Sequence, residues 1–175
     1  DQCVSPDQSI TYSDHGELCY LAWNVVKTGN GLDCSAVCPV TNATFSRNLS
    51  FHGNSLIWTF KVVNLTNSTL PFLHVMHPLM PLKEITDIEV SVFKDVVNEY
   101  NPSGLNFNTP GDLNRQLLTV KQGDYLMVIL KNTVNGRVKL GFRKGYRLII
   151  DYDGLMFPSL GIWWNNAGYP WGEGL

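Results

Sequence analysis

The chain has 175 residues, of which 44% are hydrophobic and 16% charged, and its formal net charge is −2. These proportions indicate a folded globular protein and exclude a disordered one. The 13 Lys and Arg residues are scattered, which argues against a nucleic-acid partner. The longest apolar runs are too short to span a bilayer and no signal-peptide pattern opens the sequence, so we expect no membrane partner. A single domain over residues 1–175 is expected.

Four cysteines permit disulfides or a zinc site, but their spacing favours neither. If residues 34–38 are extended, the Cα atoms of Cys34 and Cys38 lie about 13 Å apart, which is too far for a disulfide. The paired cysteines of structural zinc sites are also absent. We therefore expect buried free thiols and no metal. The compartment is left open, with the cytoplasm favoured, because secretion is suggested only weakly by four N-x-S/T sequons, at Asn42, Asn48, Asn64 and Asn67.

The first part of the chain predicts β-hairpins. The run from Leu18 to Val26 is strand-like, and residues 28–32, with Asn30-Gly31, suit a tight turn. Residues 43–51 also form a predicted strand, in which polar neighbours alternate with Phe45, Arg47, Leu49 and Phe51. A turn at residues 52–54 leads into the next hairpin. Successive hairpins indicate an antiparallel sheet.

The clearest hairpin has a strand over residues 56–63, a polar turn at residues 64–69 and a second strand over residues 70–77. On a regular second strand, His74 and His77 point to opposite faces and cannot share a metal. A proline follows His77, which places this histidine at a sheet rim, where a side chain can reach a cleft. The alternative for either histidine is a hydrogen-bonded structural role.

The second part of the chain is less regular at first. It predicts a short helix around residues 93–100 and a long loop over residues 101–114, and such loops are often functional. Strands are then expected at residues 117–121, 125–132, 137–142 and 146–152. Together these elements predict a mainly β fold, an antiparallel β-sandwich with few short helices.

The last fifteen residues are rich in aromatic rings set among Gly, Asn and Pro. Four rings fall within nine positions: Trp163, Trp164, Tyr169 and Trp171. Aromatic residues in a strand are usually core, but in loop-like sequence flat rings favour ligand stacking. Glu173 follows this cluster. Aromatic neighbours could raise its pKa and make it a base, whereas an exposed terminal glutamate is the alternative.

Three motifs together resemble the galactose mutarotase-like superfamily, whose best-known enzymes are the aldose 1-epimerases. They are DHGEL at residues 14–18, the strand LIWTFKVVN followed by LPFLHVMHPLMP, and the ending PSLGIWWNNAGYPWGEG. The resemblance implies a large antiparallel sandwich that binds sugars in an open cleft. It implies His77 as the general acid and a C-terminal glutamate, provisionally Glu173, as the base for sugar ring opening. Substrate would be bound by His15, His74 and the aromatic tail, and no cofactor or metal would be required.

Full-length members of that family are longer than this chain, and their glutamate lies in an E-P pair that is absent here. A sandwich that lacks strands exposes apolar edges. We therefore expect a piece of a longer chain, or pairing with another chain. Since folds host unrelated functions, two alternatives to an isomerase stay open. They are a noncatalytic carbohydrate-binding module and a sugar-binding domain of a larger polysaccharide-processing enzyme.

Overall fold

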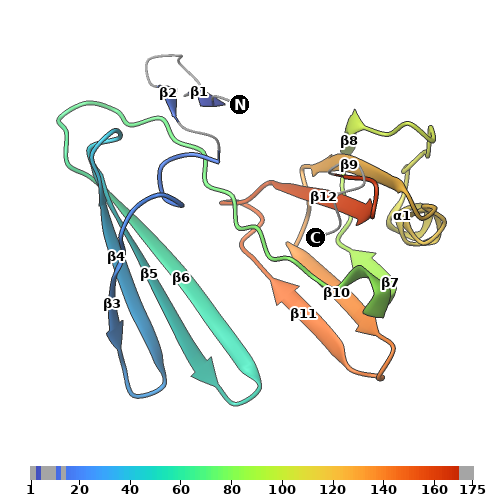
Figure 1. Ribbon diagram of the computed structural model, residues 1–175, viewed down its shortest axis with the longest axis horizontal. Coiled ribbons are helices and arrows are strands. Elements are labelled where there is room, and N and C mark those ends of the chain that lie inside the picture. Colours follow the sequence, from blue (N-terminus) through green and yellow to red (C-terminus); the bar gives the residue numbers. More distant parts are fainter. Residues whose placement is uncertain (1–2, 5–10, 13–14, 170–175) are drawn as a thin grey trace. The chain divides into compact units, whose positions relative to one another are not determined.

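A computed structural model describes residues 3–4, 11–12 and 15–169 of the chain (Figure 1). The chain divides into two compact units, Asp1–His77 and Pro78–Leu175, which are described separately below. The fold is mainly β with antiparallel sheets, which confirms the predicted fold class at that level. The expectation of one sandwich domain stays a prediction.

The first unit contains a four-stranded antiparallel sheet whose strands lie side by side in chain order (Figure 1). The strands are β3 (Asn24–Lys27), β4 (Gly31–Cys38), β5 (Ala43–His52) and β6 (Ser55–Asn64). Two short strands, β1 (Cys3–Val4) and β2 (Thr11–Tyr12), form a separate pair. The predicted turns at residues 28–32 and 52–54 are confirmed, and Gly53 adopts a left-handed φ of 58° between β5 and β6.

One face of this sheet is apolar and the other is polar, as the alternation in β5 and β6 predicts. On the apolar face, Phe45 pairs with Val62 across the two strands. Phe45 is buried together with Ala43 and Cys38, and these three side chains form the centre of a small core. Further along the same face the apolar side chains are more exposed. Phe51, near the end of β5, is 62% exposed.

Gly31 lies where β4 begins and the backbone of β5 passes close by. A Cβ atom at this position would lie 1.8 Å from the carbonyl oxygen of Leu49. The carbonyl of Gly31 also accepts a 3.0 Å hydrogen bond from the amide of Thr28, which closes the turn between β3 and β4. Only glycine fits at this point of the sheet.

The strand predicted over residues 18–26 is wrong for its first part, because β3 begins only at Asn24. The preceding segment forms turns and is attached to the sheet through Glu17. The carboxylate of Glu17 accepts hydrogen bonds from the amides of Val40 and Thr41, at 2.8 and 3.2 Å, and from the Thr41 hydroxyl at 3.2 Å. These bonds hold the segment at the turn between β4 and β5.

The strand predicted over residues 70–77 is also wrong: residues 65–81 contain neither helix nor strand. Three prolines, at positions 71, 78 and 81, cannot donate a backbone hydrogen bond, and β6 remains the edge of its sheet. His74 and His77 therefore do not occupy opposite faces of a strand, and His77 does not lie at a sheet rim.

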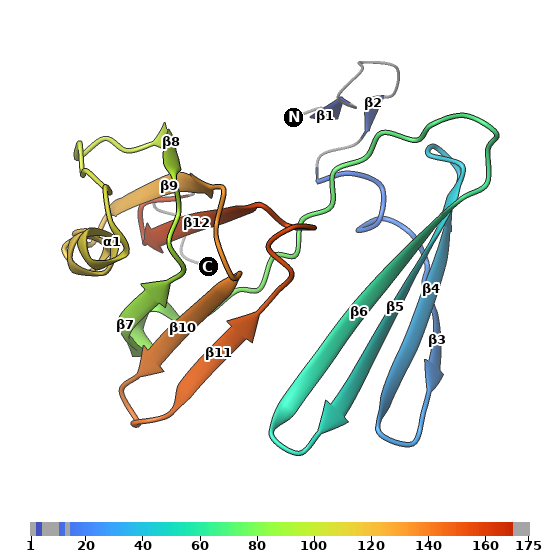
Figure 2. The same cartoon turned by 180° about the vertical axis from the view of Figure 1, so that it is seen from behind.

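The second unit contains two three-stranded antiparallel sheets. One has the order β11-β10-β7, and its strands are β7 (Ile85–Val90), β10 (Arg137–Phe142) and β11 (Arg147–Asp151). They lie side by side in Figures 1 and 2. The other has the order β12-β9-β8, and its strands are β8 (Asp95–Tyr100), β9 (Asp124–Lys131) and β12 (Ser159–Asn166). A short 3-10 helix, η1 (Leu82–Glu84), precedes β7.

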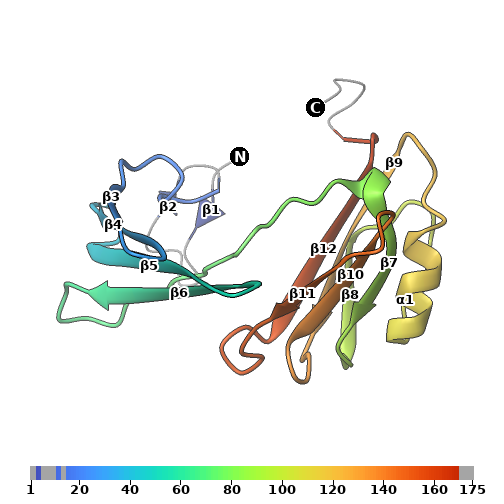
Figure 3. The same ribbon diagram turned by 90° about the horizontal axis from the view of Figure 1, so that it is seen from below.

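Both sheets and the helix α1 (Pro110–Leu117) contribute to one hydrophobic core. Helix α1 lies beside β7 and β8 (Figure 3). It buries Leu113 and Leu117, which are four residues apart and share one helix face. The side-chain oxygen of Asn114 accepts a 2.9 Å hydrogen bond from the amide of Ile88, which ties α1 to β7.

Three predictions in this unit fail in part or in full. Residues 93–100 do not form a helix, because β8 occupies most of this segment and pairs with β9. The loop predicted over residues 101–114 is interrupted at Pro110, where α1 begins. The strand predicted at residues 117–121 is absent, since α1 ends at Leu117 and a turn follows. The next three predicted strands are confirmed as β9, β10 and β11.

The thiols of Cys34 and Cys38 are free and lie on the same extended strand. Cys38 is buried, but Cys19 is exposed and Cys34 half-buried, so the expectation of buried thiols is wrong for these two. Burial raises the pKa of the Cys38 thiol, and the negative charge of Glu17 acts in the same direction.

Candidate functional site

Four aromatic side chains form a continuous cluster on the β12-β9-β8 sheet, and we call it the aromatic ladder: Tyr100, Tyr125, Trp163 and Tyr169. Tyr100 stacks on Tyr125 with ring centroids 4.1 Å apart and ring planes 10° from parallel. Tyr125 lies 5.4 Å from Tyr169, which contacts Trp163 edge-on at 5.7 Å. The ladder is partly open to solvent: Trp163 is 37% exposed, Tyr100 36% and Tyr169 46%.

Strand alternation places Trp163 and Trp164 on opposite faces of β12. Trp164 pairs with Leu126 of β9, and both side chains are buried in the core of the second unit. Trp163 pairs with Met127, whose other cross-strand neighbour is Tyr100 of β8. The three strands of this sheet thus carry one ring each to the same face, Tyr100 on β8, Tyr125 on β9 and Trp163 on β12, while Trp164 is only 7% exposed.

Tyr169 follows β12 and is positioned by Asn165. The side-chain amide of Asn165 donates a 2.5 Å hydrogen bond to the carbonyl of Tyr169. Its side-chain oxygen accepts hydrogen bonds from the amides of Gly168, at 3.0 Å, and Tyr169, at 3.1 Å. Gly168 passes so close to β9 that a Cβ there would lie 2.5 Å from the carbonyl carbon of Asp124. These contacts return the chain toward β9 and bring Tyr169 onto the ladder.

The ladder consists of three tyrosines and one tryptophan and contains no Asp, Glu, His, Lys or Arg side chain. Loss of hydration beneath the neighbouring rings, followed by the hydrogen bond with Tyr100, raises the pKa of the Tyr125 hydroxyl above its usual value near 10. The four rings of the ladder offer flat apolar faces together with phenol and indole hydrogen-bond donors. The chemistry that this surface supports is therefore stacking and hydrogen bonding.

Of the residues that the sequence singles out, Trp163 and Tyr169 come together on the ladder, and Trp164 is a core residue. Trp171 and Glu173 lie outside the described residues, so the acid–base role predicted for Glu173 stays a prediction. Sequence reasoning did not select Tyr100 or Tyr125: Tyr125 opens the strand predicted at residues 125–132, whereas Tyr100 ends the segment for which a helix was predicted and which forms β8.

The three histidines proposed from the sequence all belong to the first unit, whereas the ladder residues belong to the second. His15 is exposed and has a left-handed φ of 62°. His77 is exposed in the irregular segment. His74 is half-buried, and its ring lies 4.3 Å from that of Phe60 and 6.4 Å from that of Phe45. Burial, and then the nearby Arg47, lower the pKa of His74, so its imidazole is neutral at pH 7.

Arg47 is a further residue that sequence reasoning did not select. Its guanidinium carbon lies 4.7 Å from the ring centroid of Trp23 and 5.6 Å from that of Trp58. The sequence does contain a signal for it. In the alternation of β5, Arg47 is the only charged residue among the positions that face the apolar side.

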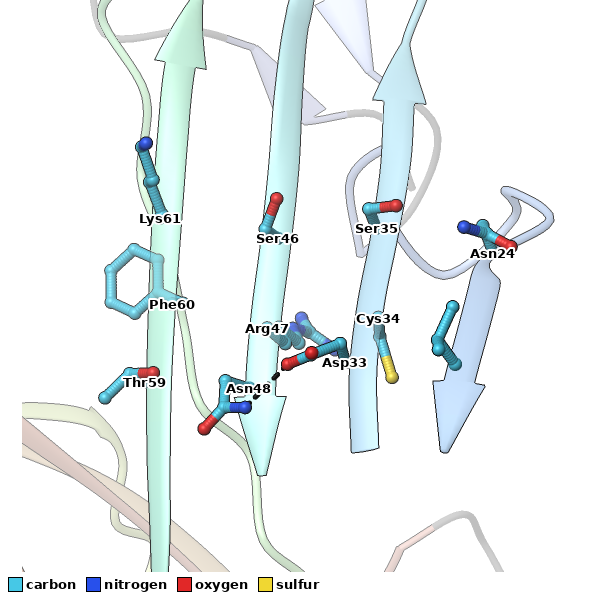
Figure 4. Close-up of a pocket in the computed structure, with 11 residues that line it drawn as sticks. Asn24, Asp33, Cys34, Ser35, Ser46, Arg47, Asn48, Thr59, Phe60 and Lys61 are labelled. Carbon is cyan, nitrogen blue, oxygen red and sulfur yellow. Dashed lines mark hydrogen bonds between the residues drawn. The ribbon is translucent and has the colours of Figure 1, made fainter. Parts of the chain in front are cut away.

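The polar face of the same sheet carries a shallow hollow of about 490 Å³ (Figure 4). Two cross-strand rows line it, Asn24–Ser35–Ser46–Lys61 and Val26–Asp33–Asn48–Thr59. A 2.6 Å hydrogen bond joins Asn48 to Asp33 across it. The remaining lining residues, Cys34, Arg47 and Phe60, alternate with these rows, so their side chains belong to the apolar face.

The second unit has another hollow, of about 760 Å³, on the side of Ser91 and Tyr152. Its two charged residues already pair with each other, since the Arg137 guanidinium donates hydrogen bonds to the Asp151 carboxylate at 2.5 and 3.0 Å. That pairing leaves mainly backbone and apolar surface for a ligand, so this hollow is the weaker candidate.

No helix in the described part of the chain is long and apolar enough to cross a membrane. Within residues 3–4, 11–12 and 15–169, no three His, Cys, Asp or Glu residues are grouped so that they could hold a metal ion. Comparison with known proteins found no protein-family model, no curated protein and no solved structure that matches this chain.

Proposed function

We propose that this protein binds carbohydrate and that the sugar stacks on the aromatic ladder. The observation that carries the proposal is the continuous contact of four partly exposed rings on one sheet face, with centroid separations of 4.1, 5.4 and 5.7 Å. Aromatic residues in a monomeric unit are normally driven into the core, as Trp164 is. A neutral aromatic surface with hydroxyl groups at its edges suits a neutral ligand that has both apolar faces and many hydroxyls.

Pyranose sugars have these properties. One face of the ring presents C–H groups, which carry slight positive charge and pack against the negative face of an aromatic ring. Burial of these C–H groups supplies apolar contact, while the tyrosine hydroxyls and the indole N–H can bond to sugar hydroxyls. Several rings in a row favour an oligosaccharide over a single sugar unit, because each ring adds contact area.

The finer fold that we propose is a β-sandwich of the galactose mutarotase-like kind. Two sheets that share one core in the second unit support this proposal, as does the four-stranded meander in the first. The chain would then represent part of a longer sandwich, or one that pairs with another chain. Exposed apolar side chains near the end of β5 and the start of β6 support that part of the proposal, since Phe51 and Leu56 are 62% and 50% exposed.

An aldose 1-epimerase-like isomerase is the enzymatic form of this proposal. His77 would protonate the ring oxygen of the sugar, and a C-terminal glutamate, Glu173 or one beyond residue 175, would accept the proton of the anomeric hydroxyl. The His77-Pro78 motif supports this form. The ladder by itself has no acid–base group, so it supports the noncatalytic binding module or the sugar-binding domain of a larger enzyme.

Binding is tested by calorimetric titration with neutral oligosaccharides of different linkage, first with the unaltered protein and then with Trp163→Ala. We expect saturable binding that weakens at least about tenfold in the variant, which corresponds to about 1.4 kcal/mol. Tyr146→Ala is the matched control, because Tyr146 is also an exposed aromatic residue of the second unit and stacks on Phe142 outside the ladder. Binding that is equal in both variants would contradict a role for the ladder.

Catalysis is tested separately by NMR measurement of anomer exchange in free aldoses. Exchange that the protein accelerates, and that His77→Asn abolishes, would support the isomerase. Oligosaccharide binding without accelerated exchange would support the noncatalytic alternatives.

A further inference from the structure

The environment of Arg47 is unusual for a charged side chain in a folded protein. Arg47 lies in the middle of β5 on the apolar face of its sheet, where the register places it opposite Phe60. The guanidinium lies over the indole of Trp23, which precedes β3, and over that of Trp58 on β6. Two elements far apart in the sequence therefore contribute an aromatic ring to the same cation.

No carboxylate neutralises this cation within the described residues. The ion pairs formed there by arginines involve Arg115 and Arg137, and Arg47 takes part in none. The Nε atom of Arg47 is also buried without a hydrogen-bond partner. Asp33 lies on the neighbouring strand, but its side chain is on the polar face and bonds to Asn48. A buried N–H without an acceptor is costly, and the aromatic contacts do not supply one.

The unmet requirement of Arg47 is therefore an acceptor in the plane of its guanidinium. The guanidinium carbon lies over both indole rings, which offer no acceptor, and the N–H donors of a guanidinium point outward in its plane. A carboxylate fits such an edge, because its two oxygens accept two parallel N–H bonds. The ring of His74, which is tilted by 31° against that of Phe60, borders the same face of the sheet, and its neutral imidazole adds no second positive charge.

We propose that Arg47, held between Trp23 and Trp58, binds the carboxylate of a sugar acid, a uronate. A carboxylate is the expected ligand group because the guanidinium has no ion-pair partner among the described residues and can present two parallel N–H donors. The sugar part of the ligand rests on the proposed carbohydrate function and on the two indoles, whose exposed surface can contact the sugar ring. Trp58 is 39% exposed, so a ligand can approach this side of the sheet from solvent.

The test compares glucuronate, its uncharged methyl ester and glucose, and it uses the full chain. Binding is followed by NMR shifts of the indole N–H signals and of the Arg47 Nε–H signal. We expect glucuronate to bind at least tenfold more tightly than the ester or glucose and to shift the Arg47 signal. Equal binding of glucuronate and its ester would overturn the proposal, and equal binding of inorganic phosphate would overturn the choice of a carboxylate.

Arg47→Lys keeps the positive charge and removes the forked geometry. We expect it to weaken glucuronate binding at least tenfold, whereas Arg115→Lys, at an exposed arginine of α1, leaves binding unchanged. Unaltered binding by Arg47→Lys would overturn the role of the guanidinium. The comparison of ligands uses the unaltered protein, so it decides the proposal even if Arg47→Lys fails to fold.

The two proposals fail in different ways. If neutral oligosaccharides bind the ladder but glucuronate shows no advantage over its ester, the carbohydrate function stands and the Arg47 site does not. If glucuronate binding depends on Arg47 while Trp163→Ala has no effect on neutral oligosaccharides, the Arg47 site stands and the ladder does not.

Discussion

Trp163 and Trp164 are adjacent in the sequence and chemically identical, but the structure gives them different roles. Trp164 is 7% exposed and belongs to the core of the second unit, while Trp163 is 37% exposed on the aromatic ladder. Replacing each with alanine, one at a time, therefore separates a packing role from a binding role. The comparison is well matched because the two changes remove the same atoms.

The expected loss of stability differs between the two variants. Removing a core tryptophan forfeits its buried apolar surface and leaves a cavity, so Trp164→Ala should lower the free energy of unfolding by about 3–5 kcal/mol. Trp163 loses less contact and leaves no enclosed cavity, so Trp163→Ala should cost about 1–2 kcal/mol. In a unit of about 100 residues, each kcal/mol lowers Tm by roughly 4–8 °C.

Urea denaturation followed by circular dichroism measures both changes, and sugar titration of the same variants measures binding. We expect Trp164→Ala to be the less stable protein and Trp163→Ala to be the weaker binder. Trp164→Phe should recover part of the lost stability, because it refills much of the cavity. Equal losses of stability in the two alanine variants would refute the assignment of the two indoles to opposite faces of β12.

Three further predictions each concern a substitution at a single position. Burial and a nearby guanidinium lower the pKa of His74 below its unfolded value of 6.5. The neutral His74 side chain therefore contributes fully to stability above about pH 6.5, and this contribution is lost as the pH falls toward the folded pKa. His74→Phe should therefore keep more of its pH 7 stability at pH 5 in urea titrations, and parallel pH profiles would contradict this. Gly31→Ala should destabilise the first unit by about 1–3 kcal/mol, because the added Cβ would lie 1.8 Å from the Leu49 carbonyl oxygen. Gly29→Ala, which has open space around it, should be nearly neutral in the same assay. The hydroxyl of Thr109 accepts a 3.1 Å hydrogen bond at the start of α1, so Thr109→Ala should cost about 1 kcal/mol and Thr109→Ser much less; similar melting temperatures for both would argue against the cap.

Local sequence pattern predicted the regular strands well. The apolar alternation of residues 43–51 and 56–63 corresponds to β5 and β6, and the runs that became β9 and β10 were identified within about one residue at each end. A strand with one buried face imposes this period directly on the sequence. Helix α1 also had a local signal that was missed, since Thr109 followed by Pro110 is typical of a helix start.

Other errors arose where distant contacts decide the structure. Residues 93–100 form β8 because β9 pairs with them, although their own sequence suggested a helix. Residues 70–77 are strongly apolar, but their prolines and the lack of a pairing strand leave them irregular. The tail was interpreted as loop, while its first part pairs along the length of β9 as β12. Strand pairing between distant segments cannot be deduced from the period of one segment alone.

The sequence by itself determined that this protein is mainly β, where most strands lie and which positions on β5 and β6 share a face, because these properties depend on neighbouring residues. Only the tertiary structure decided that Tyr100, Tyr125 and Trp163 form one surface and that Trp23 and Trp58 both lie against the guanidinium of Arg47. Both clusters join side chains from segments that are separate in the sequence. Their assembly depends on strand order and register, which the folded sheet sets through hydrogen bonds between segments that are far apart in the chain.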